Sequence, residues 1–245
     1  MNLDFGVVWQ YWPFLLEGAW LTLQLAVLGS LLGLVLGFVA ALGKLSSYPL
    51  LAAPANFYVW FIRGTPLLVQ LFIIYYGLPQ LGVQITAYTA AVLGLGINGG
   101  AYMAESYRAS ILAIPKGQTE AALSLGMTPW QAMRLIVMPQ ALRIAIPSLG
   151  NQAIILLKDS SLASVIALAE LLMVAKRYGS RHFTFLEFFL IAALIYLGLT
   201  TLFNVVINGA ERWLSADLVK DNSGRKATRL WARLAAPSAG EAGQR

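Results

Sequence analysis

Long apolar runs separated by short polar segments dominate this chain. The runs occupy residues 13–42, 50–78, 86–113, 130–157 and 183–213. Each is long enough to cross a bilayer, which takes about 20 residues in a helix. In lipid only helices and closed barrels satisfy every backbone hydrogen bond. The runs lack the alternating polarity of barrel strands, so they are expected to be helices. The pattern predicts an all-α integral membrane fold, with about five transmembrane helices in one domain over residues 1–214.

Composition supports this interpretation and excludes several kinds of chemistry. Of the 245 residues, 58% are hydrophobic and 11% charged, which is not the composition of a soluble globular domain. No cysteine is present, so there is no thiolate or disulfide, and the single histidine, His182, cannot form a paired-histidine metal site. We therefore expect no catalytic and no metal-binding residues. An intramembrane serine protease is also excluded, because no Gly-x-Ser-x-Gly elbow lies near the histidine.

The net charge of +6 comes largely from the end of the chain. Residues 215–245 are polar and basic, and we expect a flexible tail that lies on anionic lipid headgroups. The charge need not imply nucleic acid.

A short, moderately apolar segment over residues 115–139 separates two of the long runs. Pro115 is expected to stop the preceding helix, and Glu120 suits the positive end of a new short helix. Gly126 can close that helix in a left-handed turn. The predicted short helix and its turn fill about residues 115–130.

The next helix has its own start sequence. Thr128 is an N-cap, Pro129 fits the first helical position, and Gln131 completes a capping box. The resulting helix, turn and helix would present a face of small and apolar side chains made of Ala121, Ala122 and Leu125. Such a face fits a groove on a partner protein, although an ordinary amphipathic connector is the alternative.

Glycines mark two features of the first two spans. Gly29, Gly33 and Gly37 recur every fourth residue, a pattern typical of close helix contact rather than of a surface that lines a path. The segment from Arg63 to Pro66 should break the second helix. We expect Arg63 to satisfy backbone carbonyls that the break leaves free, because a charge at that depth must face protein or water.

The third span carries a polar face. Asn98, Tyr102 and Glu105 are spaced by four and three residues, so they share one side of a helix. Arg108 lies three residues further on and can pair with Glu105. A structural ion pair is one account of these residues. The other is a functional site, which intramembrane polar residues indicate by default.

A second polar cluster, Lys158 to Ser161, follows the fourth span. A helix break there would expose half-helix ends to a charged substrate, as transporters do. A plain outer loop with solvated charges is the alternative. Residues 162–174 are too short to cross and suggest a re-entrant or interfacial piece. An outer loop that contains Lys176, Arg177, Arg181 and His182 is expected to follow.

Several of these segments resemble one known family. Glu120-Ala121-Ala122, Gly126 and Met138-Pro139 are similar to the EAA loop of permeases from bacterial ATP-binding-cassette importers. The runs that resemble the permeases for polar amino acids (histidine, arginine, lysine, glutamine or glutamate) are 63–70, 101–108, 114–118 and 157–162. The resemblance covers roughly residues 10–215 and implies a type I importer permease fold.

The resemblance also implies partners. In that family the EAA loop is a coupling helix that docks into a cytoplasmic ATPase, so we expect two ATPase subunits, a second permease chain, an extracytoplasmic substrate-binding protein and an amino-acid substrate. The chain has no phosphate-binding loop of its own, since the segment from Gly37 to Lys44 has the wrong spacing. ATP and Mg²⁺ would belong to the ATPase, and this chain would hold no cofactor.

Site residues follow from the two polar clusters and from the coupling loop. We expect Asp159 and Glu105 to hold the ammonium or cationic side chain of the substrate, and Lys158 with the amides of Ser160 and Ser161 to hold its carboxylate. Asn98 and Tyr102 would shape the pocket. The residues expected to couple to the ATPase are Lys116, Gly117, Glu120, Ala121, Ala122, Leu125 and Gly126.

Orientation can be tested against charge. Five crossings put the N-terminus outside and the C-terminus in the cytoplasm of a bacterial inner-membrane protein. Lys44 and Lys116 then fall inside, as the positive-inside bias requires. The loop with Lys176, Arg177 and Arg181 falls outside, against that bias.

Two alternatives stay open on the sequence. The chain could be the structural half of a heterodimer whose partner alone binds substrate. It could also be an ion-coupled secondary transporter in which Glu105 and Asp159 carry protons, although such a transporter would not need the Glu-Ala-Ala loop.

Overall fold

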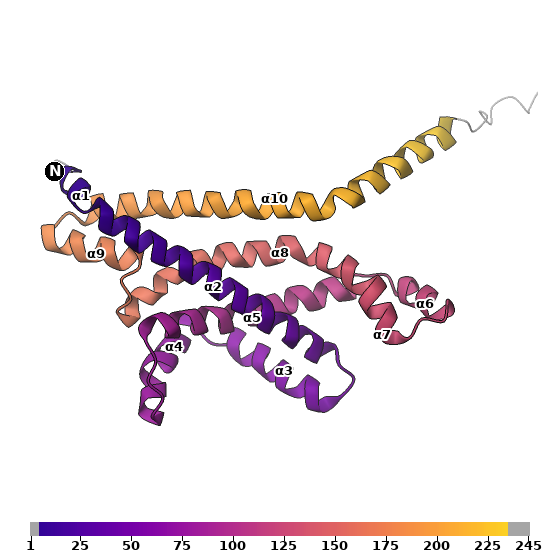
Figure 1. Cartoon of the computed structure of the whole chain (residues 1–245), viewed down its shortest axis with the longest axis horizontal. Coiled ribbons are helices and arrows are strands. Elements are labelled where there is room, and N and C mark those ends of the chain that lie inside the picture. The colour runs from indigo at the N-terminus through magenta and orange to yellow at the C-terminus, as the bar shows by residue number, and fades with distance from the viewer. Residues whose placement is uncertain (1–4, 235–245) are drawn as a thin grey trace, which may run out of the picture. The chain divides into compact units, whose positions relative to one another are not determined.

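A computed structural model describes the backbone of residues 5–234 and the side chains of residues 5–212. The described elements, shown in Figure 1, are helical: α1 (Gly6–Gln10), α2 (Trp12–Leu45), α3 (Pro49–Arg63), α4 (Leu67–Phe72), the π-helix η1 (Ile73–Gly77), the 3₁₀ helix η2 (Leu78–Leu81), α5 (Ala87–Leu112), α6 (Lys116–Ser124), α7 (Pro129–Ala132), the π-helix η3 (Met133–Val137), α8 (Met138–Asp159), the 3₁₀ helix η4 (Ser160–Ile166), α9 (Leu171–His182) and α10 (Phe185–Leu234).

The chain divides into two compact units, residues 1–207 and residues 208–245. The first contains the helical bundle, and α10 contributes residues to both. The backbone of residues 215–234 is helical, where we expected a flexible tail, because Ala, Leu, Arg and Lys there are good helix formers. The rest of the predicted tail, 235–245, lies outside the described residues.

Close packing of α2 against α5 forms the centre of the bundle, and glycines make it possible. A Cβ placed on Gly37 would lie 2.8 Å from the carbonyl oxygen of Gly100, and one on Gly33 would lie 3.2 Å from the Gly100 nitrogen. A Cβ on Gly29 would lie 2.9 Å from the Cβ of Leu95. The expected role of the three glycines in helix contact is confirmed.

The second apolar run is broken, as predicted, into α3 and the helical segment Leu67–Leu81, which begins with α4. The two segments are bent by 106° relative to each other. Gln70 satisfies the carbonyls at the break: its Nε2 donates to the carbonyl oxygens of Ile62, at 2.8 Å, and Thr65, at 3.1 Å. The role expected for Arg63 at these carbonyls is therefore wrong. The amide of Gln70 lies one turn into the new helix and reaches back across the break, whereas the side chain of Arg63 is exposed.

Proline also explains the irregular start of the fourth run. The π-helical turn η3 ends two residues before Pro139. Pro139 has no N–H, and its ring would crowd the carbonyl of Leu135 in a regular helix. Pro147 lies within α8 without ending it, so the sequence is helical from Pro129 to Ile166.

Three described helices are long and apolar enough to cross a membrane: Trp12–Leu45, Pro129–Ile166 and Phe185–Arg212. The bent pair α3 and α4 makes a fourth if it is one span. The third predicted span is α5, which is 26 residues long. It is not among the apolar spans because it carries the polar face, and its centre packs against neighbouring helices.

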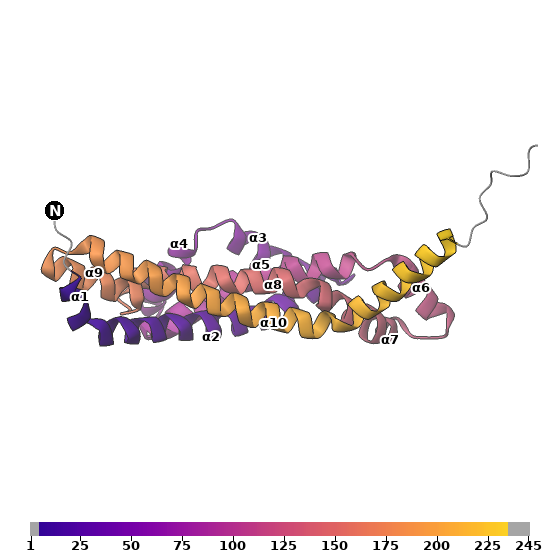
Figure 2. The ribbon, with the colours of Figure 1, turned by 90° about the horizontal axis from the view of Figure 1, so that it is seen from above.

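The two ends of the bundle have different elements. Figures 1 and 2 place α1 and α9 at one end and α6 and α7 at the other. The segment with Lys176, Arg177 and Arg181 is the helix α9 and not the predicted loop. Its apolar residues Leu171, Val174 and Ala175 recur at helical spacing and are buried, which stabilises the helix.

We predict that Gly37→Ala lowers the stability of the bundle by about 1–3 kcal/mol, because the added methyl group overlaps the backbone of α5. The measurement is thermal unfolding in detergent, followed by tryptophan fluorescence. Gly198→Ala in α10 is the control, because a Cβ there meets nothing within 4 Å. The stability of that variant should be unchanged or higher by up to about 1 kcal/mol. Equal stability losses in the two variants would contradict the packing account.

Candidate functional site

The polar face of α5 opens on a cavity between α2, α3 and α5. The cavity has a volume of about 490 Å³. It is lined by Lys44, Asn56, Val59, Trp60, Arg63, Gly64, Tyr102 and Glu105. Two of the seven residues expected to bind substrate, Tyr102 and Glu105, therefore lie together in one hollow of the bundle.

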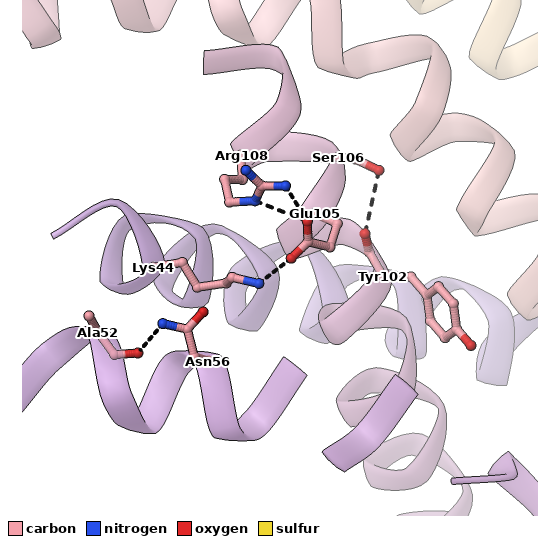
Figure 3. A network of polar contacts seen from close by, with 7 residues as sticks. All are labelled: Lys44, Ala52, Asn56, Tyr102, Glu105, Ser106 and Arg108. Atoms are coloured by element: carbon pink, nitrogen blue, oxygen red, sulfur yellow. Dashed lines mark hydrogen bonds and ion pairs between the residues drawn. The ribbon is translucent and has the colours of Figure 1, made fainter. Parts of the chain in front are cut away.

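An ion-pair network forms one wall of this cavity (Figure 3). Lys44, near the end of α2, pairs with Oε1 of Glu105. Arg108 donates from Nε, at 3.0 Å, and from Nη2, at 2.8 Å, to Oε2 of the same carboxylate. The predicted pair of Glu105 with Arg108 is confirmed, and the sequence did not indicate that Lys44 joins it from α2.

Both oxygens of Glu105 are thus occupied by cations of the chain. A substrate ammonium that approached Glu105 would have to compete with Lys44 and Arg108. The cost of an uncompensated charge in a partly buried site is high, so the three groups stabilise one another as a unit. In this conformation Glu105 connects α2 to α5 and its charge is balanced.

Arg63 brings a second positive charge to the cavity. Its guanidinium carbon lies 5.2 Å from the centroid of the Tyr102 ring, within the range of a cation–π contact. Among the described residues Arg63 forms no ion pair. Its N–H donors are therefore able to meet a carboxylate in the cavity.

Asn98 lies on α5 but away from the cavity. Its side chain is buried, and its Nδ2 donates to Oε1 of Gln70 at 3.1 Å. Gln70 in turn satisfies the carbonyls at the break between α3 and α4. Asn98 therefore fixes the break against α5, and it shapes the cavity only through that helix.

The cluster from Lys158 to Ser161 lies at a different level of the bundle. Ser106 contacts Ser148 at 2.8 Å, and a Cβ on Gly99 would meet the side chain of Leu156. These two contacts align the antiparallel helices α5 and α8. By a rise of 1.5 Å per residue, Asp159 is roughly 14 Å from Glu105 along the axis of α5. The two acids therefore do not form one site here.

The α-helix α8 ends at Asp159, within this cluster as expected, but the chain continues as the 3₁₀ helix η4, so the expected break that exposes half-helix ends is wrong. The amide of Ser160 donates to the carbonyl of Leu156, and its hydroxyl donates to the carbonyl of Leu157 at 2.7 Å. The chain stays helical through η4 and leaves the helix only at Ala167, which has φ +60°. Ser and Asp can continue a helix when their hydrogen bonds are made locally, so the polar composition alone did not mark a break.

The next helix N-terminus is already occupied by the chain itself. The carboxylate of Glu170 accepts from the amides of Leu172, at 2.9 Å, and Met173, at 2.7 Å, and thus caps α9. Tyr196 of α10 donates to the same carboxylate at 2.7 Å, and Thr22 of α2 donates at 3.4 Å. An anionic substrate would find no free helix end there.

The coupling loop forms a short helix and a tight turn, as predicted. Gly126 has φ +84°, and the amide of Met127 donates to the carbonyl of Ala122 across the turn, in a Schellman motif. The capping box of Thr128 and Gln131 is present. However, α6 begins at Lys116, so Glu120 lies in its middle and not in its first turn.

The residues expected to contact an ATPase do not share one face of α6. Ala122 is buried, whereas Ala121 and Leu125 are exposed, Leu125 at 81%. Lys116, Gly117, Glu120 and Gly126 are exposed as well. The predicted face of Ala121, Ala122 and Leu125 is wrong in its composition, because the turn after Ser124 directs Leu125 outward while Ala122 packs inward.

A second cavity, of about 350 Å³, separates α6 from α5 and η3. It is lined by Ile111, Leu112, Ile114, Lys116, Thr119, Glu120, Met133 and Val137. α6 lines one side of this cavity, and the end of α5 with η3 lines the other.

Sequence reasoning missed Gln70 and Glu170. Both are isolated polar residues in apolar runs, which is the pattern that marks a functional or structural role in a membrane protein. That pattern could have found them, but their partners, up to 148 residues away, could not be read from spacing.

Comparisons with known proteins agree on one family. Residues 33–217 match the family model described as "Binding-protein-dependent transport system inner membrane component". The chain is 43% identical over 223 residues to the Vibrio harveyi protein named "Probable amino-acid ABC transporter permease protein PatM", covering 90% of this chain and 98% of that one. It is 40% identical over 218 residues to the Bacillus subtilis "Arginine transport system permease protein ArtQ", covering 89% and 100%.

A solved structure is also similar. It is described as "Crystal structure of an amino acid ABC transporter with histidines", and one of its chains is 43% identical to this chain with a TM-score of 0.81. The match covers 86% of this chain and 99% of that one.

We predict that Gln70→Leu lowers stability by about 1–3 kcal/mol, because it leaves the carbonyls of Ile62 and Thr65 without their donor. Arg63→Gln should leave stability within about 0.5 kcal/mol, since Arg63 is exposed and does not satisfy the break. Thermal unfolding in detergent measures the stability loss of each variant relative to the wild type. A larger loss in Arg63→Gln than in Gln70→Leu would restore the role first expected for Arg63.

Proposed function

We propose that this chain, which belongs to the family of binding-protein-dependent transport system inner membrane components, imports a polar or charged amino acid at the expense of ATP. In this proposal the chain is the permease subunit: it provides the translocation path and transmits the work of partner ATPases. The names of its relatives, which include an amino-acid and an arginine permease, support the substrate class. The observation that carries the proposal is the exposed helix and turn at one end of the bundle.

The coupling surface consists of α6 and the turn that follows it. Leu125 is an apolar side chain exposed at 81% on the turn, next to the exposed Glu120 and Gly126. An exposed leucine on a rigid turn suits a groove on another protein. Two ATPases, each holding ATP and Mg²⁺, would grip the α6 helices of two permease chains.

The transmission path within the chain runs from α6 to α5. Pro115 lies between the two helices and keeps them from forming one continuous helix. α6 can therefore change its angle to α5 and still push on the end of α5. The cavity beside α6 provides space for such a movement. The π-helical turn η3 provides an irregular segment at which the next helix can bend. A shift at the end of α5 would alter the wall of the substrate cavity, where Glu105 is paired with Lys44 of α2.

The substrate path would contain polar groups at two levels. At the first, Arg63 and Tyr102 face the cavity, and we assign the substrate carboxylate to Arg63 because its guanidinium donors are open there. At the second, Lys158 and Asp159 offer one charge of each sign. Movement between the levels is the step that the ATPases would drive.

The proposed orientation places α6 in the cytoplasm and α9 outside a bacterial inner membrane. It follows from the need of α6 to meet cytoplasmic ATPases. The substrate-binding protein then meets the end of the bundle that contains α1 and α9.

We predict that Leu125→Asp reduces ATP-driven amino-acid uptake at least tenfold in proteoliposomes that hold the whole transporter, because a charge in the apolar groove prevents docking. Leu81→Asp is the matched control, since Leu81 is equally exposed, at 80%, but belongs to η2 and lies outside the coupling surface. Co-purification of the ATPase should fall in the first variant and persist in the second. Uptake that survives Leu125→Asp, or uptake without any ATPase, would contradict the proposal.

We predict that Arg63→Gln raises the KM for uptake about tenfold or more and leaves basal ATPase activity unchanged, because it removes a charge-assisted bond to the substrate carboxylate. Arg63→Lys keeps the charge but not the planar guanidinium. Its KM should lie between those of the wild type and Arg63→Gln. The measurement is initial uptake rate against substrate concentration. An unchanged KM would remove Arg63 from the site.

A further inference from the structure

One face of α9 is strongly basic and open to solvent. Lys176, Arg177, Ser180 and Arg181 are all exposed, and their spacing places them on one side of the helix. The opposite side, which includes Leu171, Val174 and Gly179, is buried against the bundle. The helix therefore packs by one face and presents three cations on the other.

These cations have no acidic partner among the residues whose side chains the structure describes. Among the described residues the ion pairs are those of Glu105, and none involves α9. A helix of 12 residues with three unpaired cations creates a local positive field that favours an anionic partner.

An exposed aromatic residue ends the same helix. Phe183 is 88% exposed and has φ +58°, in the left-handed region that favours glycine at a helix C-terminus. A phenylalanine in this conformation strains the backbone and gains nothing from burial within the chain. Aromatic and arginine side chains side by side are the common anchors of protein interfaces.

The other end of α9 is tied to two long helices. The buried carboxylate of Glu170 caps α9 and accepts hydrogen bonds from Thr22 of α2 and Tyr196 of α10. The hydroxyl of Thr22 also accepts from the amide of Leu171 at 3.2 Å. A force on the exposed face of α9 would therefore reach α2, which packs directly against α5.

We propose that the basic face of α9, with Phe183 at its end, is the surface that receives the substrate-binding protein, and that this protein presents carboxylates to it. The inference rests on the proposed function, because it uses the orientation in which α6 meets the ATPases and α9 lies outside. Figure 1 places α6 and α9 at opposite ends of the bundle. The match to a family of binding-protein-dependent systems supplies the kind of partner.

A protein partner explains the position of these charges better than lipid does. Basic residues outside the membrane run against the positive-inside bias of short loops, so membrane insertion gives no reason for three of them there. A complementary acidic surface does give a reason, because charge pairs across an interface speed association and fix its register. The exposed Phe183 adds an apolar anchor at the edge of the charged face.

The test measures the affinity of the assembled transporter for its own substrate-binding protein, purified with amino acid bound. The transporter is held in nanodiscs of zwitterionic lipid, so anionic headgroups play no part. We expect the triple variant Lys176→Gln, Arg177→Gln, Arg181→Gln to raise Kd about tenfold or more at low ionic strength. The difference from the wild type should shrink at roughly 0.5 M salt, where exposed charges are screened.

The charge-conserving variant Lys176→Arg, Arg177→Lys, Arg181→Lys is the matched control and should keep the wild-type Kd within about threefold, since it changes the side chains but not their charge. Phe183→Gly provides a second, independent variant. It should weaken binding several-fold without lowering the unfolding temperature, because glycine relieves the left-handed strain.

Basal ATPase activity separates this inference from the proposed function. If the triple variant keeps its basal activity and its wild-type Kd, the docking surface is elsewhere and the inference is overturned. If instead the wild-type chain supports no ATPase activity with any partner ATPase, the proposed function itself fails.

Discussion

The close approach of α2 and α5 is the constraint on which the bundle depends. Glycines at every fourth position of α2 bring its backbone against α5, where even one added methyl group would meet main-chain atoms. α5 carries Tyr102 and Glu105 of the cavity lining and is too polar to count among the apolar spans. A polar helix persists in a membrane only where protein covers its polar groups, and α2, α3 and α8 provide that cover.

Polar groups that contact other helices are paired, whereas those on the outer surfaces at the two ends of the bundle are not. Glu105 is balanced by Lys44 and Arg108, and Gln70 donates to the carbonyls at the helix break. At the ends, Leu125 on one side and the cations of α9 on the other are left open. Paired groups hold the helices together, and open groups are where other molecules can act. Glu170 and the end of α5 connect these open surfaces to the centre.

The sequence predicted features that depend on local chemistry. The glycine contacts, the break after Arg63, the left-handed Gly126 and the capping box of Thr128 all follow from the conformations that neighbouring residues allow. Features that depend on tertiary contacts could not be found this way. The donor at the break is Gln70, and Asp159 lies at a different level from Glu105 because the register of two antiparallel helices is set by side-chain packing along their whole length.

The most direct test of the account is the side of the membrane on which the two open ends lie. The chain has no cysteine, so a single cysteine at position 125 or at position 177 can be labelled alone with a membrane-impermeant maleimide. The account predicts that Leu125→Cys is labelled only in inside-out vesicles and is protected by the bound ATPase, whereas Arg177→Cys is labelled only in right-side-out vesicles. Labelling of both positions from the same side, or of Leu125→Cys from outside, would contradict it.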